Sequence, residues 1–183
     1  MTNFEYQLLL KIQELMGNRF FDDFFATFTK FGNAGIIWIL ICSILLIYKP
    51  TRKLGFLALV ALLFEFTLND LILKPIFARP RPFMTFEIYP IIKQPSGFSF
   101  PSGHAASSLA VATILMIHKY PGRHFIMVLA LLMAFSRVYL MVHYPFDVLM
   151  GIIVGVLSAF IVYKVSKNRG FDASIVSNQP PME

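Results

Sequence analysis

Long apolar segments separated by polar connections dominate the chain. Between residues 33 and 163, the longest of these connections is residues 74–101, which are rich in Pro, Gly and charged residues. A run of about 20 apolar residues is long enough for an α-helix to cross the hydrocarbon region of a bilayer. The pattern therefore predicts an all-α integral membrane bundle with five clear spans, over residues 33–48, 54–73, 102–118, 125–142 and 145–163.

The first 32 residues are less regular. Phe4, Leu8 and Leu15 recur at helical spacing among charged residues, and the aromatic stretch 20–31 carries Asp22, Asp23 and Lys30. Such amphipathic stretches favour one or two helices lying at the membrane interface. A broken first span is the alternative, and it would make the bundle one of six helices.

No linker interrupts the apolar region, so we expect one membrane domain with two flanking parts. Residues 1–32 would form the N-terminal interfacial or broken helix, and residues 33–167 the core. Residues 168–183 are polar and would form a cytoplasmic tail.

Composition narrows the class of protein further. Hydrophobic residues make up 57% of the chain and include 20 Phe, which excludes a soluble phosphate-binding module. The single cysteine, Cys42, supports neither a disulfide nor a zinc site. The net charge of +6 comes from basic residues at the ends of the apolar segments, which indicates orientation in a membrane rather than binding to nucleic acid.

Threading five spans through a membrane sorts the basic loop residues into two groups. Because positive residues of short loops favour the cytoplasm, the larger group predicts the cytoplasmic face. That group is Lys49, Arg52, Lys53, Lys119, Arg123, Lys164, Lys167 and Arg169. The smaller group, Lys74, Arg79, Arg81, Lys93 and Arg137, would lie at the extracytoplasmic face of the cell membrane.

Three clusters of polar residues fall on this second face. They are Lys74 with Arg81-Pro82, then Pro101-Ser102-Gly103-His104, then Ser136-Arg137 with His143 and Asp147. The second cluster opens an apolar run, so Ser102 can cap a helix whose first free N–H groups favour an anion. Gly103 lets another group approach closely. Cations, a helix start and histidines together suggest phosphate chemistry.

The three clusters resemble the signature of the type 2 phosphatidic acid phosphatases, also called lipid phosphate phosphatases. That signature reads Lys-x6-Arg-Pro, Pro-Ser-Gly-His and Ser-Arg-x5-His-x3-Asp, and every fixed residue of it is present here in order. The short chain is similar to bacterial undecaprenyl-diphosphatases. The intact motif is similar to the broader branch that includes phosphatidylglycerophosphate and phosphatidate phosphatases.

Charge and geometry give the same roles that the resemblance implies. Lys74, Arg81 and Arg137 would bind phosphate oxygens, together with Ser102 and the N–H of Gly103. His143 would be the nucleophile and form a phosphohistidine, with Asp147 holding its other ring nitrogen. His104 would protonate the leaving group.

Neighbouring residues have secondary roles in this interpretation. Asp70 is expected to pair with Lys74 four residues on, although Glu65 and Asp70 could instead form a proton route. Arg79 is expected to steer anions. The histidine pair lacks the further ligands that zinc or a two-metal centre needs, so we expect metal-independent catalysis without a cofactor.

The expected function is hydrolysis of a phosphate or diphosphate end on a membrane lipid, with undecaprenyl diphosphate favoured. Phosphatidylglycerophosphate or phosphatidate hydrolysis is an alternative, as is a phosphotransferase that passes the phosphoryl group to a lipid acceptor. Glu65, Asp70 and Arg137 inside apolar segments also permit a lipid or ion transporter.

Overall fold

A computed structural model describes residues 2–171 and 173, and the described chain is helical without strands. Residues 172 and 174–183 of the predicted tail lie outside the described part. The elements in order are α1 (Thr2–Met16), α2 (Arg19–Phe28), the 3₁₀ segment η1 (Thr29–Gly35), α3 (Ile36–Ile47), η2 (Lys49–Thr51), α4 (Arg52–Phe66), the π-helical η3 (Thr67–Leu73), α5 (Lys74–Phe77), α6 (Pro82–Thr85), α7 (Gly103–Ile117), α8 (Arg123–Tyr139) and α9 (Pro145–Asn168).

The predicted all-α membrane bundle is confirmed. Each of the five predicted spans is helical over most of its length. Three stretches that are helical over most of their length, Arg19–Ile47, Lys49–Thr85 and Pro145–Asn168, are long and apolar enough to cross a bilayer, and α7 is a shorter apolar helix.

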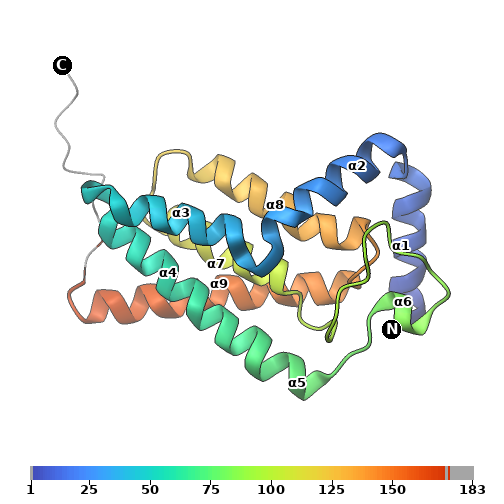
Figure 1. The fold of residues 1–183 in the computed structure, drawn as a ribbon. Helices are drawn as coiled ribbons and strands as arrows, with labels where there is room; N and C mark the ends of the chain where they lie inside the picture. The colour runs from blue at the N-terminus through green and yellow to red at the C-terminus, as the bar shows by residue number, and fades with distance from the viewer. Residues whose placement is uncertain (1, 172, 174–183) are drawn as a thin grey trace.

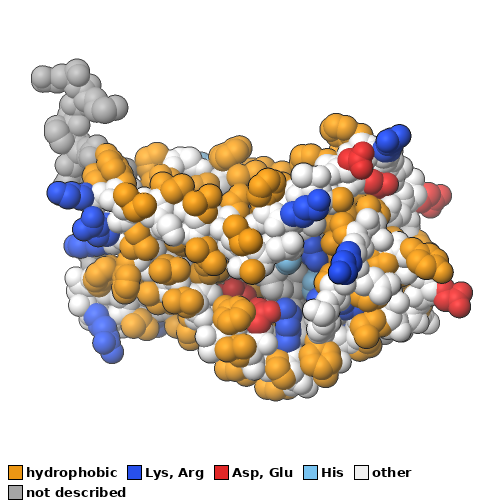
Figure 2. Space-filling view, viewed as in Figure 1, with side chains coloured by type: hydrophobic (Ala, Val, Ile, Leu, Met, Phe, Trp, Pro, Cys, Tyr) orange, Lys and Arg blue, Asp and Glu red, His pale blue; other side chains and the backbone are white. Residues whose placement is uncertain are grey.

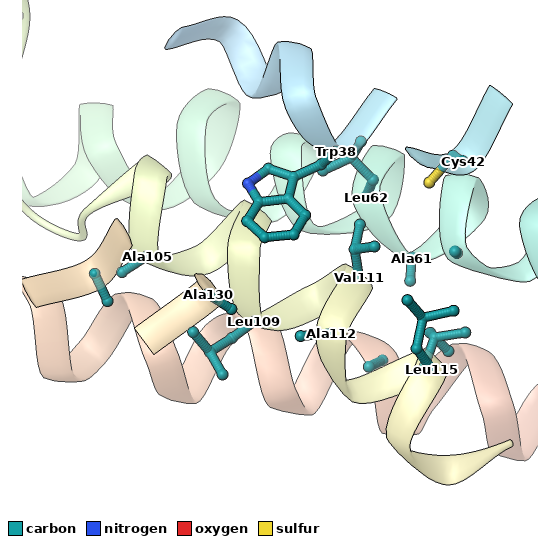
Figure 3. Packing of buried hydrophobic residues seen from close by; sticks show 14 of the residues in the cluster. Trp38, Cys42, Ala61, Leu62, Ala105, Leu109, Val111, Ala112, Leu115 and Ala130 are labelled. Carbon is teal, nitrogen blue, oxygen red and sulfur yellow. The ribbon is translucent and has the colours of Figure 1, made fainter. Parts of the chain in front are cut away.

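The core lies around α7, which packs against α4, α8 and α9. Its residues from Ala105 to Leu115 are all buried. The approach to α9 depends on small residues, since a Cβ at Gly155 would lie 2.3 Å from the carbonyl oxygen of Ala106. On its other side, Trp38 and Leu62 pack near Val111 (Figure 3). This tight packing holds the first turn of α7 in one place.

The N-terminal region has two parts. Helix α1 lies across one end of the bundle, whereas α2 continues into α3 through η1 (Figure 1). The continuity is broken where Ala34 and Gly35 adopt φ values of 50° and 68°, in the left-handed region. The predicted start at residue 33 therefore coincides with a kink inside a longer helical stretch.

The two ends of the bundle differ in what they carry. One end holds the α3–α4 and α7–α8 connections and the end of α9, and basic side chains cluster there at the left of Figure 2. The other end holds α1, α5, α6, the start of α7 and the α8–α9 turn (Figure 1). The three polar clusters all lie at this second end.

Candidate active site

A cavity of about 830 Å³ opens at the end of the bundle where the three clusters meet. In Figure 2, histidine and basic side chains are visible inside a hollow near the middle of the face. Six of the eight predicted site residues line the cavity, namely Lys74, Arg81, Gly103, His104, Arg137 and His143. The other two, Ser102 and Asp147, are fully buried and do not line it.

The turn between α8 and α9 positions the candidate nucleophile. Pro145 opens α9, where its missing N–H costs no helical hydrogen bond. Asp147, in the first turn of α9, accepts a hydrogen bond at 2.9 Å from the backbone N–H of Tyr144. The start of α9 therefore holds the turn that carries His143.

The contacts of His143 define its protonation state. Arg81 Nη1 lies 3.1 Å from His143 Nε2, and because a guanidinium only donates, Nε2 accepts and the ring proton lies on Nδ1. Burial of the ring, and then the charges of Arg81, Arg137 and Lys74, hold the pKa of His143 well below its ordinary value. The ring is neutral, with a lone pair on Nε2, as a nitrogen nucleophile requires.

Asp147 is connected to Nδ1, the other ring nitrogen of His143, through the hydroxyl of Ser99. Its Oδ2 lies 3.7 Å from His143 Nδ1, which is too long for a direct hydrogen bond. The Ser99 hydroxyl donates to this Oδ2 at 2.5 Å and lies 3.4 Å from Nδ1. Ser99 was not among the predicted site residues. It lies just before the second cluster and bridges His143 and Asp147.

Two buried guanidinium groups have no salt-bridged counter-ion among the residues that the structure describes. Arg81 donates to three backbone carbonyl oxygens at 2.9–3.2 Å, and Arg137 donates to the hydroxyl of Thr29. Neither forms a salt bridge with a carboxylate in the described part of the chain, and Nε of Arg137 has no hydrogen-bond partner there. Their side chains are only 5% and 2% exposed. Buried cations without a partner are costly, so this arrangement favours an anionic ligand.

Lys74 is paired, as predicted, with Asp70. The pair lies against the start of α7, where a Cβ at Gly103 would stand 3.1 Å from an Asp70 oxygen and 3.2 Å from Lys74 Nζ. A glycine at this position allows the close approach that the sequence predicted. The carboxylate neutralises Lys74, so this pair adds little net charge to the cavity.

Ser102 precedes α7, but its hydroxyl does not cap the helix, so that prediction is wrong. Its Oγ is buried without a hydrogen-bond partner among the described residues. The Ser102 backbone packs closely against α9, where a Cβ at Gly151 would lie 2.5 Å from the Ser102 carbonyl oxygen. The backbone N–H of Ser102 donates to the Asp147 carbonyl oxygen at 3.0 Å.

Segment η1 forms a wall of the site that the sequence analysis did not predict. His104 Nε2 lies 3.2 Å from the side-chain oxygen of Asn33, which gives Nε2 the proton in this orientation of the amide. A Cβ at Gly32 would lie 2.6 Å from the His104 ring. Thr29, at the start of η1, accepts the hydrogen bond of Arg137. The polar sequence at 32–35 indicates a helix break but not its place beside His104.

The comparison with known families agrees with this geometry. A family model described as the PAP2 superfamily matches residues 52–171, which is most of the chain and includes all three clusters. The chain belongs to the PAP2 superfamily. The resemblance to type 2 phosphatidic acid phosphatases is therefore confirmed.

Similar proteins and a similar solved structure extend this result. An undecaprenyl-diphosphatase of Sulfolobus acidocaldarius is 33% identical over 140 residues, which cover 75% of this chain and 66% of the relative. The undecaprenyl-diphosphatase BcrC of Bacillus subtilis is 29% identical over 91 residues, covering 50% and 47%. The matches thus span between about half and two thirds of these relatives' lengths.

One solved structure that resembles the chain is a transmembrane PAP2-type phosphatidylglycerolphosphate phosphatase from Bacillus subtilis. It superposes with a TM-score of 0.73 at 27% identity, covering 91% of this chain and 86% of that one. Together with the apolar helices, this similarity identifies the chain as a multi-pass membrane protein.

Arg79 was expected to steer anions towards this PAP2 site, but its guanidinium is bound to two carboxylates. It donates to Asp147 at 2.5 Å and to Glu5 of α1 at 2.6 Å, and its guanidinium lies 4.1 Å from the centre of the Tyr144 ring. Glu5 also accepts from the N–H of Phe146 at 3.1 Å. Two carboxylates neutralise Arg79, so it holds Asp147 from behind rather than attracting a ligand.

The PAP2 site offers cations and N–H groups rather than metal ligands. Among the described residues, no three His, Cys, Asp or Glu side chains are grouped so that they could hold a metal ion. Of the carboxyls, Glu65 and Asp70 line the cavity, and Asp70 is already bound to Lys74.

Proposed function

We propose that this PAP2 protein is a lipid phosphate phosphatase that removes the terminal phosphate of a membrane lipid, with undecaprenyl diphosphate as the favoured substrate. The observation that carries the proposal is the pair of uncompensated guanidiniums, Arg81 and Arg137, beside the lone pair of a neutral His143. A phosphate supplies the negative charge that they lack, next to a nucleophile for its phosphorus. The names of the two undecaprenyl-diphosphatase relatives favour the substrate.

In the first step, His143 Nε2 attacks the terminal phosphorus and the bond from phosphorus to the leaving oxygen breaks. Arg81, Arg137 and Lys74, with the N–H of Gly103, bind the oxygens whose charge grows in the transition state. The proton on Nδ1 is held by Ser99 and Asp147, which stabilise the positive ring that forms. His104 takes up a proton on its second ring nitrogen when the anionic substrate enters, and this imidazolium donates its Nε2 proton to the leaving oxygen and becomes neutral.

In the second step, water attacks the phosphorus of the phosphohistidine and the nitrogen–phosphorus bond breaks. His104, now without its Nε2 proton, accepts a proton from this water. The electron pair of the broken bond returns to Nε2 of His143. Phosphate leaves, and both histidines recover their starting protonation. No metal takes part in the proposed cycle.

A phosphatidylglycerophosphate phosphatase is the second candidate, because the solved structure with that name covers 91% of the chain. The groups that bind the terminal phosphate, namely Arg81, Arg137, Lys74 and the N–H of Gly103, form a phosphate cradle that would be the same for both lipids. Only the groups that meet the rest of the lipid would differ, so a direct comparison of substrates separates the two candidates.

The proposed location is the cell membrane, with the site at the extracytoplasmic face. Support comes from the basic residues at the opposite end of the bundle, which the positive-inside rule assigns to the cytoplasm. A membrane-impermeant substrate analogue added to intact cells should be hydrolysed. Hydrolysis only after lysis would reverse the orientation.

The function is tested by phosphate release from the detergent-purified protein in the presence of a chelator. Undecaprenyl diphosphate, phosphatidylglycerophosphate and phosphatidate are compared for wild type, His143→Ala and the control His124→Ala, whose exposed histidine lies at the opposite end. We expect release by wild type and control, loss in His143→Ala, and the highest rate with undecaprenyl diphosphate. No release by wild type, or full activity in His143→Ala, would contradict the proposal and favour a transporter or a phosphotransferase.

A further inference from the structure

We propose that Lys30 and Lys93 form a second anion subsite at the cavity mouth, which binds the second phosphate of a lipid diphosphate. Both lysines are exposed and both line the cavity, although neither belongs to the three clusters. The proposal rests on the phosphatase function above and narrows its substrate from lipid phosphates in general to lipid diphosphates.

The charge of the inner cavity matches only one phosphate group. Lys74 is neutralised by Asp70, which leaves Arg81 and Arg137 as the uncompensated cations of the cradle. A phosphate monoester carries about two negative charges at neutral pH, and a diphosphate end carries about one more. Glu65, the other carboxyl on the wall, would raise the need for cations if it were charged. A diphosphate therefore needs positive charge beyond the cradle.

Lys30 lies on the side from which the leaving group departs. The leaving oxygen must be within reach of His104, its proton donor, and His104 contacts Asn33 of η1. Lys30 belongs to the same segment, three residues before Asn33, and both residues line the cavity. In a lipid diphosphate the leaving group is itself a phosphate. Lys30 is placed to neutralise it.

Lys93 reaches the mouth from the segment that holds Arg81. It lies three residues before Ser96, whose carbonyl accepts from Arg81 at 3.2 Å, and the neighbouring Gly97 carbonyl accepts from the same guanidinium at 2.9 Å. Lys30 in turn follows Thr29, the partner of Arg137. Each segment that anchors a cradle arginine thus also carries one lysine at the mouth.

Neither lysine forms a hydrogen bond or an ion pair within residues 2–171 and 173. Their ammonium groups are therefore available to a ligand. Because both are exposed and have no partner in the part of the chain that the structure describes, replacing them removes no contact seen there on which folding depends.

The first test compares two lipids that share one polyprenyl tail, one ending in a diphosphate and one in a monophosphate. The double variant Lys30→Ala/Lys93→Ala is measured beside Lys164→Ala/Lys167→Ala, which removes the same charge from exposed positions of α9 at the other end. We expect kcat/KM for the diphosphate to fall by about tenfold in the first variant, and that for the monophosphate by about twofold or less. Equal falls for both lipids, or no fall, would overturn the subsite.

A second test measures binding without turnover. Methylenediphosphonate, a non-hydrolysable diphosphate, and inorganic phosphate are titrated into each protein by calorimetry. Wild type and control should bind the diphosphonate about tenfold more tightly than phosphate, and Lys30→Ala/Lys93→Ala should lose this preference. A preference that survives in the variant refutes the subsite even if wild type is an active phosphatase. A lysine-dependent preference in a protein that hydrolyses no lipid refutes the phosphatase function and leaves the subsite standing.

Discussion

The two sides of His143 treat charge in opposite ways. Behind the ring, Asp147 accepts hydrogen bonds from Ser99 and Arg79, and Arg79 also binds Glu5. These four residues are buried or nearly so, and every charge among them has a partner of opposite sign. In front of the ring, the buried guanidiniums of Arg81 and Arg137 meet no carboxylate in the described chain.

This difference in charge pairing distinguishes residues that position His143 and Asp147 from residues that are available to bind a ligand. A buried charge whose partner is removed strongly destabilises a protein, because it remains desolvated without compensation. A buried charge that never had a partner already carries that cost, as functional sites often do. Substitutions behind the ring should therefore lower mainly the stability of the protein. Substitutions in front of the ring should lower mainly its activity.

The largest effect on activity is expected from Arg137→Met in front of the ring. We expect kcat/KM to fall by about 10²–10³-fold, the usual loss when one donor to the transition-state charge is removed. The melting temperature in detergent should not fall, because the change removes an uncompensated buried cation. Arg169→Met, at the exposed end of α9, is the matched control. A large loss of stability with activity retained would erase the distinction between the two sides.

An intermediate effect, with the opposite balance, is expected from Arg79→Met behind the ring. It leaves Asp147 and Glu5 without their cation, and we expect the free energy of unfolding to fall by about 2–3 kcal/mol, less than for a fully buried pair because Arg79 is 20% exposed. The value of kcat should fall while KM changes little, because Arg79 positions Asp147 and does not contact the substrate.

A double-mutant cycle sharpens this prediction. The double variant Glu5→Gln/Arg79→Met should lose clearly less unfolding free energy than the sum of the two single variants. Each single change already breaks the Glu5–Arg79 interaction, so the second change cannot break it again. Arg79→Lys should recover part of the stability. Additive costs, or a rise in KM alone, would show that Arg79 does not hold Asp147.

The smallest effect concerns a single proton. Because the pKa of His143 is lowered, its ring should stay neutral as the pH falls through the ordinary histidine value of about 6.5, and should protonate only in more acidic solution. Ring ¹⁵N shifts of labelled protein, assigned with His143→Gln, should report a neutral ring with the proton on Nδ1 at pH 6. A ring that is protonated at pH 6, or one protonated on Nε2, would contradict the contact with Arg81.

The sequence was sufficient to predict the apolar spans and the meeting of the three clusters, because both follow from patterns along the chain. The Lys74–Asp70 pair was also predictable from its spacing of four residues. The wall formed by η1 was not, since Thr29 and Asn33 reach the site only through the kink between α2 and α3. Glu5 was likewise unpredictable, because its contact with Arg79 joins residues that are 74 positions apart.

Ser102 and Arg79 illustrate a second limit. A serine before an apolar run is a good capping residue, yet the Ser102 hydroxyl is buried and makes no capping hydrogen bond. An arginine beside a phosphate motif suggests steering, yet its charge is used inside the protein. Residue type predicted that these positions matter, whereas only tertiary contacts define what they do.

The central claim is that Nε2 of His143 carries the phosphoryl group between the two steps, and trapping that intermediate tests it most directly. Protein mixed with lipid labelled in its terminal phosphate is quenched in base, where phosphohistidine survives, and the labelled peptide is mapped by mass spectrometry. The account predicts label on Nε2 of His143 in wild type and none in His143→Ala. Label on another residue or on Nδ1, or rapid turnover with no phosphoenzyme, would contradict it.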